Sequence, residues 1–191
     1  LHLIEAAQRR ADYAQSLVAT FVQSARDAWQ PDASVRLRAS ELVGALRDEY
    51  PFEGDEAHWL QCDLAADFSL PGRRDLLYLV LCTLVKNALL ALRPQPPAVP
   101  RVRVVLERTA AVPGLPQQPT IAVIDNGPGI APEVLARLTR EPVTTRAATG
   151  GSGMGLLFGH RVMSSLGGAL VVRSTPGQGA SVRLHFPLED A

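Results

Sequence analysis

The sequence is poor in the residues that build disulfide scaffolds and zinc sites. Its only cysteines are Cys62 and Cys82, which form no CxxC pair. This argues against both kinds of site and fits a reducing compartment. Charge of one sign is also lacking, because 19 Lys and Arg residues balance 19 Asp and Glu residues. A net charge of zero gives no electrostatic basis for binding nucleic acid or an anionic membrane surface.

Targeting and membrane signals are missing as well. We find no signal peptide, no internal repeat, and no apolar run near the roughly 20 residues that span a bilayer. The chain begins at Leu1, without a methionine and inside a helical pattern, so we expect it to be part of a longer protein. Apolar residues are abundant at 47%, enough for the core of one large domain or of a medium domain with an appendage.

Hydrophobic spacing predicts mixed secondary structure. We expect helices at 1–29, 39–50, 73–92, 131–138 and 155–166. We expect strands at 58–65, 101–108, 120–125, 169–174 and 180–186. Because no βαβ repeat is present, this order predicts an α+β two-layer sandwich.

The first predicted helix carries a regular apolar seam. Its members step alternately by three and four residues, namely Ile4, Ala7, Ala11, Ala14, Val18, Phe21, Ala25 and Ala28. This spacing is typical of a coiled coil or a four-helix bundle. A helix packed against its own domain remains the alternative.

A glycine-rich loop, 149-TGGSGMGL-156, directly precedes the last predicted helix. It is not a GxGxxG motif, because Leu156 stands where the third glycine belongs, and no Gly-Lys pair of a P-loop exists. Unpaired N–H groups at a helix start can still bind phosphate, and glycine allows close approach. Alone, the loop could equally be a connector.

Three other segments have the same ambiguity. In 125-DNGPGI-130, the Asp125 carboxylate could accept a hydrogen bond from a base amine, or the segment could be a simple turn. Asn87 interrupts an apolar helix and needs a partner if it is buried. Its oxygen suits Mg²⁺ and Lys86 suits phosphate, unless this is an exposed helix edge. The segment 177-GQGASVRLHF-186 by itself indicates a hairpin.

Taken in order, the four segments resemble the ATP-binding domain of sensor histidine kinases, a fold shared with the gyrase, heat-shock-90 and MutL ATPases. KNALLAL resembles the N box, DNGPG the first glycine box, GGSGMGL the second, and GQGASVRLHFP the closing glycine motif. The likeness covers about residues 40–188. With 49-EYPF-52, it is most similar to hybrid kinases of the autoinducer-sensing type.

The resemblance implies a fold and a domain division. We expect a mixed five-stranded sheet backed by three helices, with an ATP lid running from about Ile130 to Gly150. Residues 1–30 would be the second helix of a dimerisation hairpin, and 31–191 the catalytic ATP-binding domain.

The resemblance also implies ATP and Mg²⁺ as cofactors and assigns residues to them. Asp125 would bind adenine and Asn87 would bind Mg²⁺, while Lys86 would reach phosphate and Thr83 would complete the catalytic set. Further nucleotide contacts would come from Gly127, Gly129, Ile130 and Ala180, from the lid residues Thr144, Thr145 and Arg146, and from the helix start at Gly151, Ser152, Gly153, Met154, Gly155 and Leu156.

Several positions depart from the family pattern. Thr83 stands where Asn, Glu or another polar group is usual, and a hydroxyl is a poor general base, which disfavours a gyrase-type ATPase. The lid's usual aromatic pair falls at Thr139 and Pro142, Arg146 replaces a lysine, and Ala180 replaces a threonine. These departures keep open a degenerate nucleotide-binding scaffold without kinase activity.

None of the four histidines has the setting of a phosphoacceptor. His2 lies near the start of the first helix, and we place His58 at a strand edge, His160 in the last helix and His185 in the last strand. We therefore expect the γ-phosphoryl of ATP to pass to a histidine on an upstream hairpin helix.

The expected partners follow from this assignment. They are that upstream helix, a second protomer, and a response regulator or fused receiver domain, with neither nucleic acid nor membrane contacted by this fragment. The expected location is the cytoplasmic portion of a membrane-anchored bacterial sensor.

Overall fold

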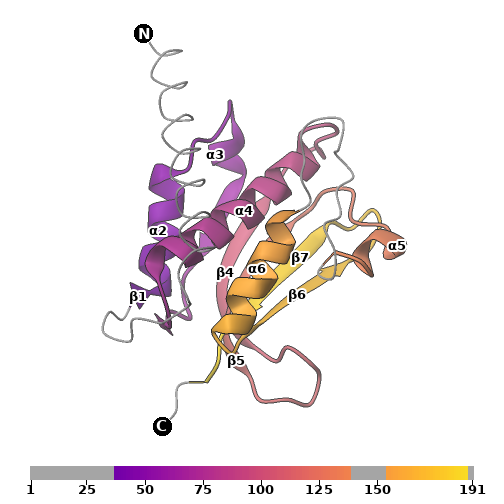
Figure 1. Ribbon diagram of the computed structural model, residues 1–191. Coiled ribbons are helices and arrows are strands. Elements are labelled where there is room, and N and C mark those ends of the chain that lie inside the picture. Colours follow the sequence, from indigo (N-terminus) through magenta and orange to yellow (C-terminus); the bar gives the residue numbers. More distant parts are fainter. Residues whose placement is uncertain (1–36, 139–153, 189–191) are drawn as a thin grey trace.

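The computed structural model describes residues 37–138 and 154–188. Within them, the fold has two layers, a sheet and a set of helices packed on one of its faces (Figure 1). The predicted helix at 1–29 and most of the predicted lid lie outside the described residues.

The main sheet has five strands in the order β2-β4-β5-β7-β6. They are β2 (Leu60–Asp63), β4 (Val102–Thr109), β5 (Gln118–Asp125), β6 (Ala169–Ser174) and β7 (Ala180–His185). The pairing of β2 with β4 is parallel and the other pairings are antiparallel, so the sheet is mixed. The predicted hairpin of 101–108 with 120–125 is confirmed as β4 and β5, and the predicted α+β architecture is confirmed with it.

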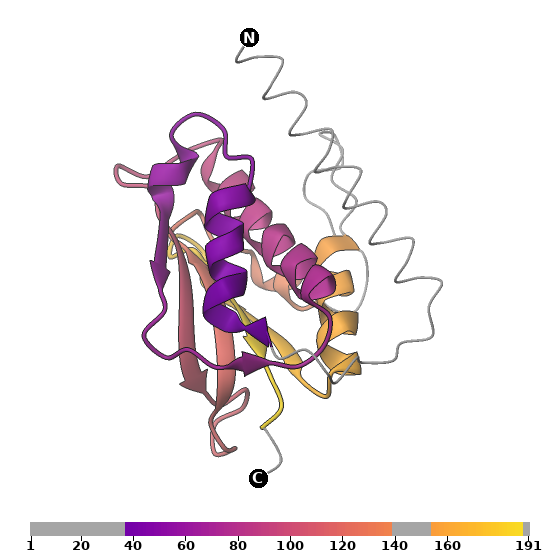
Figure 2. The same ribbon diagram turned by 90° about the vertical axis from the view of Figure 1, so that its left-hand side faces the viewer.

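Three longer helices cover one face of this sheet, namely α2 (Ala39–Glu49), α4 (Arg74–Leu92) and α6 (Met154–Ser165) (Figure 2). Residues of the strands, such as Val104 of β4 and Ile121 of β5, are buried in the same core as Leu81 and Leu84 of α4. Strands and helices thus share one hydrophobic core.

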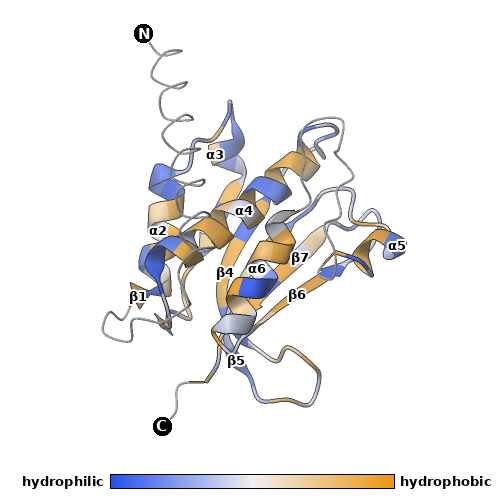
Figure 3. Ribbon diagram, in the orientation of Figure 1, coloured by the Kyte–Doolittle hydropathy of each residue, from blue (hydrophilic) through white to orange (hydrophobic). Residues whose placement is uncertain are grey.

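The central helix α4 is apolar along most of its length (Figure 3). By length and composition it could cross a membrane, so the expectation that no run approaches that length is wrong. The reason is its central position: 61% of its most apolar window is buried inside the domain, where it packs on α2, α6 and the sheet. A helix with neighbours on several sides is apolar on several sides.

Some short elements differ from the sequence prediction. The strand expected at 58–65 is only Leu60–Asp63, because α3 (Glu56–Trp59) precedes it. The Glu56 carboxylate accepts a hydrogen bond from the Glu53 N–H, 2.9 Å away, and pairs with Arg93 at the end of α4, which holds this helical turn in place.

The helix expected at 131–138 is the single turn α5 (Pro132–Leu135). A two-stranded ribbon of β1 (Leu37–Arg38) and β3 (Ser69–Leu70) was not predicted, and two-residue strands are too short to show alternation.

Candidate nucleotide-binding site

Two of the predicted motifs meet where three neighbouring strands end. In the ladder of β5 with β7, Asp125 lies opposite Ala180, and in the ladder of β7 with β6, Ala180 lies opposite Ser174. The loop after β5 and the turn before β7 therefore leave the sheet side by side. These are the segments that resemble the first glycine box and the closing glycine motif.

Asp125 ends β5 and is buried, with 9% of its surface exposed. Its Oδ1 accepts hydrogen bonds from the backbone N–H of Gly127 at 2.9 Å and of Ala180 at 3.3 Å. Burial raises the pKa of Asp125, and these two donors partly oppose the shift. Within residues 37–138 and 154–188, no donor hydrogen-bonds to Oδ2, so this oxygen can accept a hydrogen bond from a ligand.

The two loops approach each other too closely for side chains. Gly129 has a φ of +74°, and a Cβ there would lie 2.3 Å from the Thr175 carbonyl oxygen. Gly179 has a φ of +79°, and its Cβ would lie 2.0 Å from the Asp125 carbonyl oxygen. Both positions require glycine for conformation and for space. The loop around Asp125 is therefore built against the 175–179 turn.

Helix α4 connects this end of the site to the two other motifs, around Asn87 and at the start of α6. Gly127 packs against its last turn, where an added Cβ would lie 3.6 Å from Ala91 Cβ. One turn earlier, Asn87 is half-buried and faces the start of α6, since a Cβ at Gly155 would lie 3.8 Å from its Nδ2. The structure thus places Asn87, Gly127 and Gly155 along one side of α4.

The side chains of Thr83 and Lys86 are placed differently from each other. Thr83 faces α6, and a Cβ at Gly155 would lie 2.6 Å from its Cγ2. Its hydroxyl donates to the Leu79 carbonyl oxygen at 2.8 Å, which commits its proton to its own helix. Lys86 is exposed on the surface of α4. A hydroxyl bonded in this way is suited to orienting a group and unsuited to removing a proton.

The remaining predicted contacts are only partly described. Ile130 follows the glycine loop and is half-buried, while Leu156 lies in the first turn of α6 and packs against the core. Met154 is the first residue of α6. The predicted lid and glycine-loop residues Thr144, Thr145, Arg146, Gly151, Ser152 and Gly153 lie outside the described residues, as do Thr139 and Pro142.

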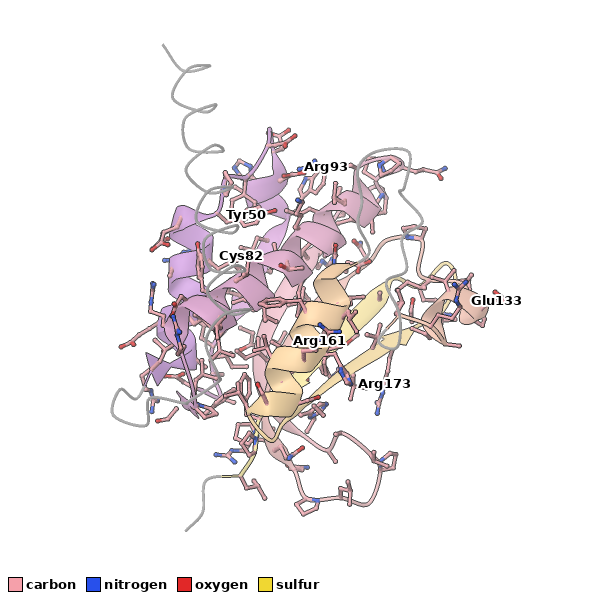
Figure 4. All side chains as sticks on the ribbon, viewed as in Figure 1. Tyr50, Cys82, Arg93, Glu133, Arg161 and Arg173 are labelled. Atoms are coloured by element: carbon pink, nitrogen blue, oxygen red, sulfur yellow. The ribbon has the colours of Figure 1, made fainter. Side chains whose placement is uncertain are left out.

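Figure 4 shows the side chains and labels residues on three helices near this region. Arg93 lies at the end of α4, Arg161 on α6, and Glu133 on α5 beyond the sheet. Arg161 and Glu133 are exposed. Among the described residues, no group of three or more His, Cys, Asp or Glu side chains could hold a metal ion.

The histidines are placed mostly as expected. His160 lies in α6 and His185 in β7, where it is buried and its Nδ1 is 3.1 Å from Thr120 Oγ1. Burial lowers the pKa of His185. The expectation for His58 is wrong: it lies exposed in the short helix α3 and not at a strand edge. The ion pair of Glu56 with Arg93 holds this helical turn in place before the strand begins. His2 lies outside the described residues.

Two residues near Asp125 were missed by the sequence analysis. The Asn126 amide accepts from the Arg101 N–H and donates to the Val99 carbonyl oxygen, both at 2.8 Å, which fixes the start of β4 beside the glycine loop. The Ser174 hydroxyl contacts both loops. A polar residue at the end of a strand indicates a side chain that needs a hydrogen-bond partner. Most of the partners of these two residues are far away in sequence, so the sequence does not identify them.

The comparisons with known proteins agree with this geometry. The profile of the histidine kinase-, DNA gyrase B- and HSP90-like ATPase family matches residues 72–190. The two-component sensor PprA of Pseudomonas aeruginosa is 36% identical over 118 residues, which are 61% of this chain and 12% of that protein. The CAI-1 autoinducer sensor kinase/phosphatase CqsS of Vibrio cholerae is 32% identical over 136 residues, which are 71% of this chain and 18% of that protein.

Solved structures have the same fold. The mycobacterial sensor histidine kinase MprB has a TM-score of 0.61 at 19% identity, covering 80% of this chain and 96% of that one. Full-length ShkA in complex with AMPPNP has a TM-score of 0.65 at 22% identity, covering 97% of this chain and 38% of that one.

These similarities define the family but not the type of sensor. Relatives of autoinducer and other sensor types match at similar identity, so the resemblance to autoinducer-sensing kinases stays a prediction. The chain also spans less than a fifth of the length of the two curated relatives named above. By the matched profile and the shared fold, the chain belongs to the histidine kinase-, DNA gyrase B- and HSP90-like ATPase family, as a catalytic ATP-binding domain of the sensor histidine kinase type.

Proposed function

We propose that this domain binds Mg·ATP and transfers its γ-phosphoryl group to a histidine on an upstream dimerisation hairpin. One observation carries the proposal: a single helix, α4, connects a buried carboxylate site at Asp125 with the start of α6 at Gly155. The carboxylate site is suited to binding the base of a nucleotide, and the start of α6 is suited to binding its phosphates. Phosphoryl transfer needs chiefly this kind of positioning and charge neutralisation.

Base binding is assigned to Asp125. Its Oδ1 is occupied by backbone donors, and its Oδ2 is available to accept a hydrogen bond from the exocyclic amine of adenine. Guanine presents a carbonyl oxygen at the corresponding position, which would face the carboxylate without a proton between them. We assign further contacts to Gly127, Gly129, Ile130 and Ala180, which surround Asp125 in sequence or in the ladder.

Phosphate binding is assigned to the start of α6. A helix of this length, Met154–Ser165, presents unpaired N–H groups and a partial positive charge at its first turn. We assign the phosphates to Gly151, Ser152, Gly153, Met154, Gly155 and Leu156, with Lys86, Thr144, Thr145 and Arg146 as further contacts. ShkA, which shares this fold, was solved in complex with AMPPNP, an ATP analogue, and this supports nucleotide binding in general.

Magnesium fits the residues present. The Asn87 amide is half-buried beside Gly155, and no described residue hydrogen-bonds to it. We propose that Asn87 holds Mg²⁺, which would neutralise phosphate charge during transfer. Thr83 is proposed to orient groups beside Asn87, since its proton is already donated to Leu79.

We also propose how the domain is assembled and located. Residues 1–30 would form the second hairpin helix and 31–191 the catalytic domain, paired with a second protomer. The phosphoryl group would continue to a response regulator or a fused receiver domain. The whole would be the cytoplasmic portion of a membrane-anchored bacterial sensor.

Two other functions make different predictions. A degenerate scaffold is favoured by Thr83, Thr139 and Pro142, and it would bind nucleotide, or fail to bind it, without transferring phosphate. A gyrase-type ATPase would hydrolyse ATP as this fragment alone, which the bonded hydroxyl of Thr83 disfavours.

The test is transfer from [γ-³²P]ATP in the longer protein that carries the upstream hairpin. We expect acid-labile, base-stable labelling of that protein, as phosphohistidine gives, and little phosphate release by the 191-residue chain. Nucleotide binding without labelling would favour the scaffold, and rapid hydrolysis by the short chain would favour the ATPase.

A further inference from the structure

Ser174 lies between the two segments that form the proposed base-binding end of the site, the loop after Asp125 and the turn before Ala180. It is the last residue of β6 and lies opposite Ala180, which in turn lies opposite Asp125. Its side chain is partly buried. Ser174 is thus two strands away from the Asp125 carboxylate, across the sheet, and it is not one of the nucleotide contacts assigned above.

The Ser174 hydroxyl makes two hydrogen bonds to two different segments. Its oxygen accepts from the Ile130 N–H at 2.9 Å, at the end of the 125-DNGPGI-130 loop. Its proton is donated to the Gly179 carbonyl oxygen at 2.6 Å, in the residue before Ala180. One hydroxyl therefore connects the loop that follows Asp125 with the turn that precedes Ala180.

Strand pairing alone does not fix these two groups. The ladders end at Asp125, Ala180 and Ser174, so Ile130 and Gly179 lie beyond the last paired residues. A second link is the Gly177 N–H donating to the Pro128 carbonyl oxygen at 2.7 Å. This bond joins the middles of the two segments, whereas the Ser174 hydroxyl joins Ile130 to the residue that adjoins Ala180. Both Ile130 and Ala180 are proposed base contacts.

We propose that Ser174 is a positioning residue for base recognition. It touches no nucleotide and acts by setting the position of Ile130 relative to Asp125 and Ala180. This inference rests on the proposed function, because it specifies how the same site selects its base. The geometry required is narrow, since a hydrogen bond from Asp125 to an exocyclic amine depends on where the flat ring is held.

Replacing Ser174 tests the inference. Ser174→Ala leaves the Ile130 N–H and the Gly179 carbonyl without these partners. We expect ADP binding, measured by titration calorimetry, to weaken about five- to tenfold, the loss typical of one or two hydrogen bonds. The ratio of ADP to GDP affinity should fall as well. A merely structural role would weaken both nucleotides equally or would lower the melting temperature alone.

Matched variants separate these outcomes. Ser174→Thr keeps the hydroxyl and suits a strand end, so ADP affinity and base selectivity should return to near the wild-type values. Ser181→Ala is the control: Ser181 is also a partly buried β-strand serine, and its hydroxyl accepts a hydrogen bond from Arg183. We expect its affinity ratio to be unchanged. If Ser174→Ala does not fold, Ser174→Cys, with its weakly hydrogen-bonding thiol, should show an intermediate loss of selectivity.

Failure of the inference differs from failure of the proposed function. If wild-type protein binds ADP more tightly than GDP and Ser174→Ala keeps the same ratio, Ser174 has no positioning role and the inference is overturned alone. If wild-type protein binds neither nucleotide, the proposed function fails and the inference fails with it.

Discussion

At the scale of single residues, the buried carboxylate of Asp125 carries a cost for the fold. Burial raises its pKa, which means that the folded protein disfavours the charged form. The group therefore contributes stability that is fully present below its unfolded pKa of about 3.8 and is lost as the pH rises through the folded pKa.

Asp125→Asn should separate stability from binding. The amide oxygen can still accept from Gly127 and Ala180, and the variant has no ionisable group to bury, so we expect its free energy of unfolding at pH 7 to equal or exceed that of the wild-type protein. Relative to this variant, wild-type protein should become less stable as the pH rises from about 4 to 7. Urea denaturation at several pH values measures both.

Binding should respond differently to the same substitution. The new NH₂ group would place a donor against the donor of adenine, and ADP affinity should fall by at least about tenfold if one charged hydrogen bond is lost. Asp125→Ala is the contrast, because it removes the acceptor for two backbone N–H groups and should lower stability as well. An Asn variant that still binds ADP normally would remove Asp125 from the site.

At the scale of secondary-structure elements, the contact of α4 with α6 depends on a missing side chain. Gly155 lies in the first turn of α6, where an added Cβ would lie 2.6 Å from Thr83 Cγ2. Thr83 cannot rotate away freely, because its hydroxyl donates to the Leu79 carbonyl oxygen. The two helices are therefore held at the distance that glycine allows.

Gly155→Ala should destabilise the protein by about 1–2 kcal/mol, since overpacking outweighs the gain in helix propensity. Thr83→Ser removes the methyl group and keeps the hydroxyl, so the double variant should recover most of this loss. The coupling energy from a denaturation double-mutant cycle is expected to be about 1 kcal/mol or more.

Gly44 supplies the matched control for this substitution. It lies inside α2, where an added Cβ would meet nothing within 4 Å. Gly44→Ala should therefore stabilise the protein by about 0.5–1 kcal/mol. If Gly155→Ala behaved like Gly44→Ala, the close approach of α4 and α6 would be wrong.

The elements also show what the sequence could predict. Residues 169–174 begin with a short apolar run that includes two valines, and they are bounded by glycine and a turn, so the strand has the predicted bounds. The strand at 58–65 was predicted too long because Glu56 is held by Arg93, which lies 37 residues later. Likewise, Ser174 and Ile130 are 44 residues apart and meet only through the strand register. Local periodicity carries no information about such partners.

At the scale of the whole molecule, the candidate site is built from distant parts of the chain. Asn87 comes from α4, Asp125 from the end of β5, Gly155 from α6 and Ala180 from the start of β7. A ligand that touched all of them would bind the folded protein and have no equivalent site in the unfolded chain. Such a ligand stabilises the fold by an amount that grows with the logarithm of its concentration relative to its dissociation constant.

We therefore predict that Mg·ADP raises the melting temperature of the 191-residue chain. At a concentration about 100 times the dissociation constant, the stabilisation of about 2.7 kcal/mol corresponds to a rise of about 5–10 °C for a protein of this size. The measurement is a thermal melt at fixed protein concentration with ADP, ADP plus Mg²⁺, and Mg²⁺ alone. If Asn87 holds the metal, Mg²⁺ should add to the ADP shift in wild-type protein and add little in Asn87→Ala.

GTP and Asp125→Asn complete this experiment. If Asp125 selects the base, Mg·GTP should produce a much smaller shift than Mg·ATP at equal concentration. Asp125→Asn should melt at or above the wild-type temperature without nucleotide and should lose most of the shift with it. Equal shifts with ATP and GTP would mean that phosphate contacts alone hold the nucleotide, because such contacts do not distinguish the bases. If no adenine nucleotide shifted the melting temperature, the assignment of this surface as the nucleotide site would be contradicted.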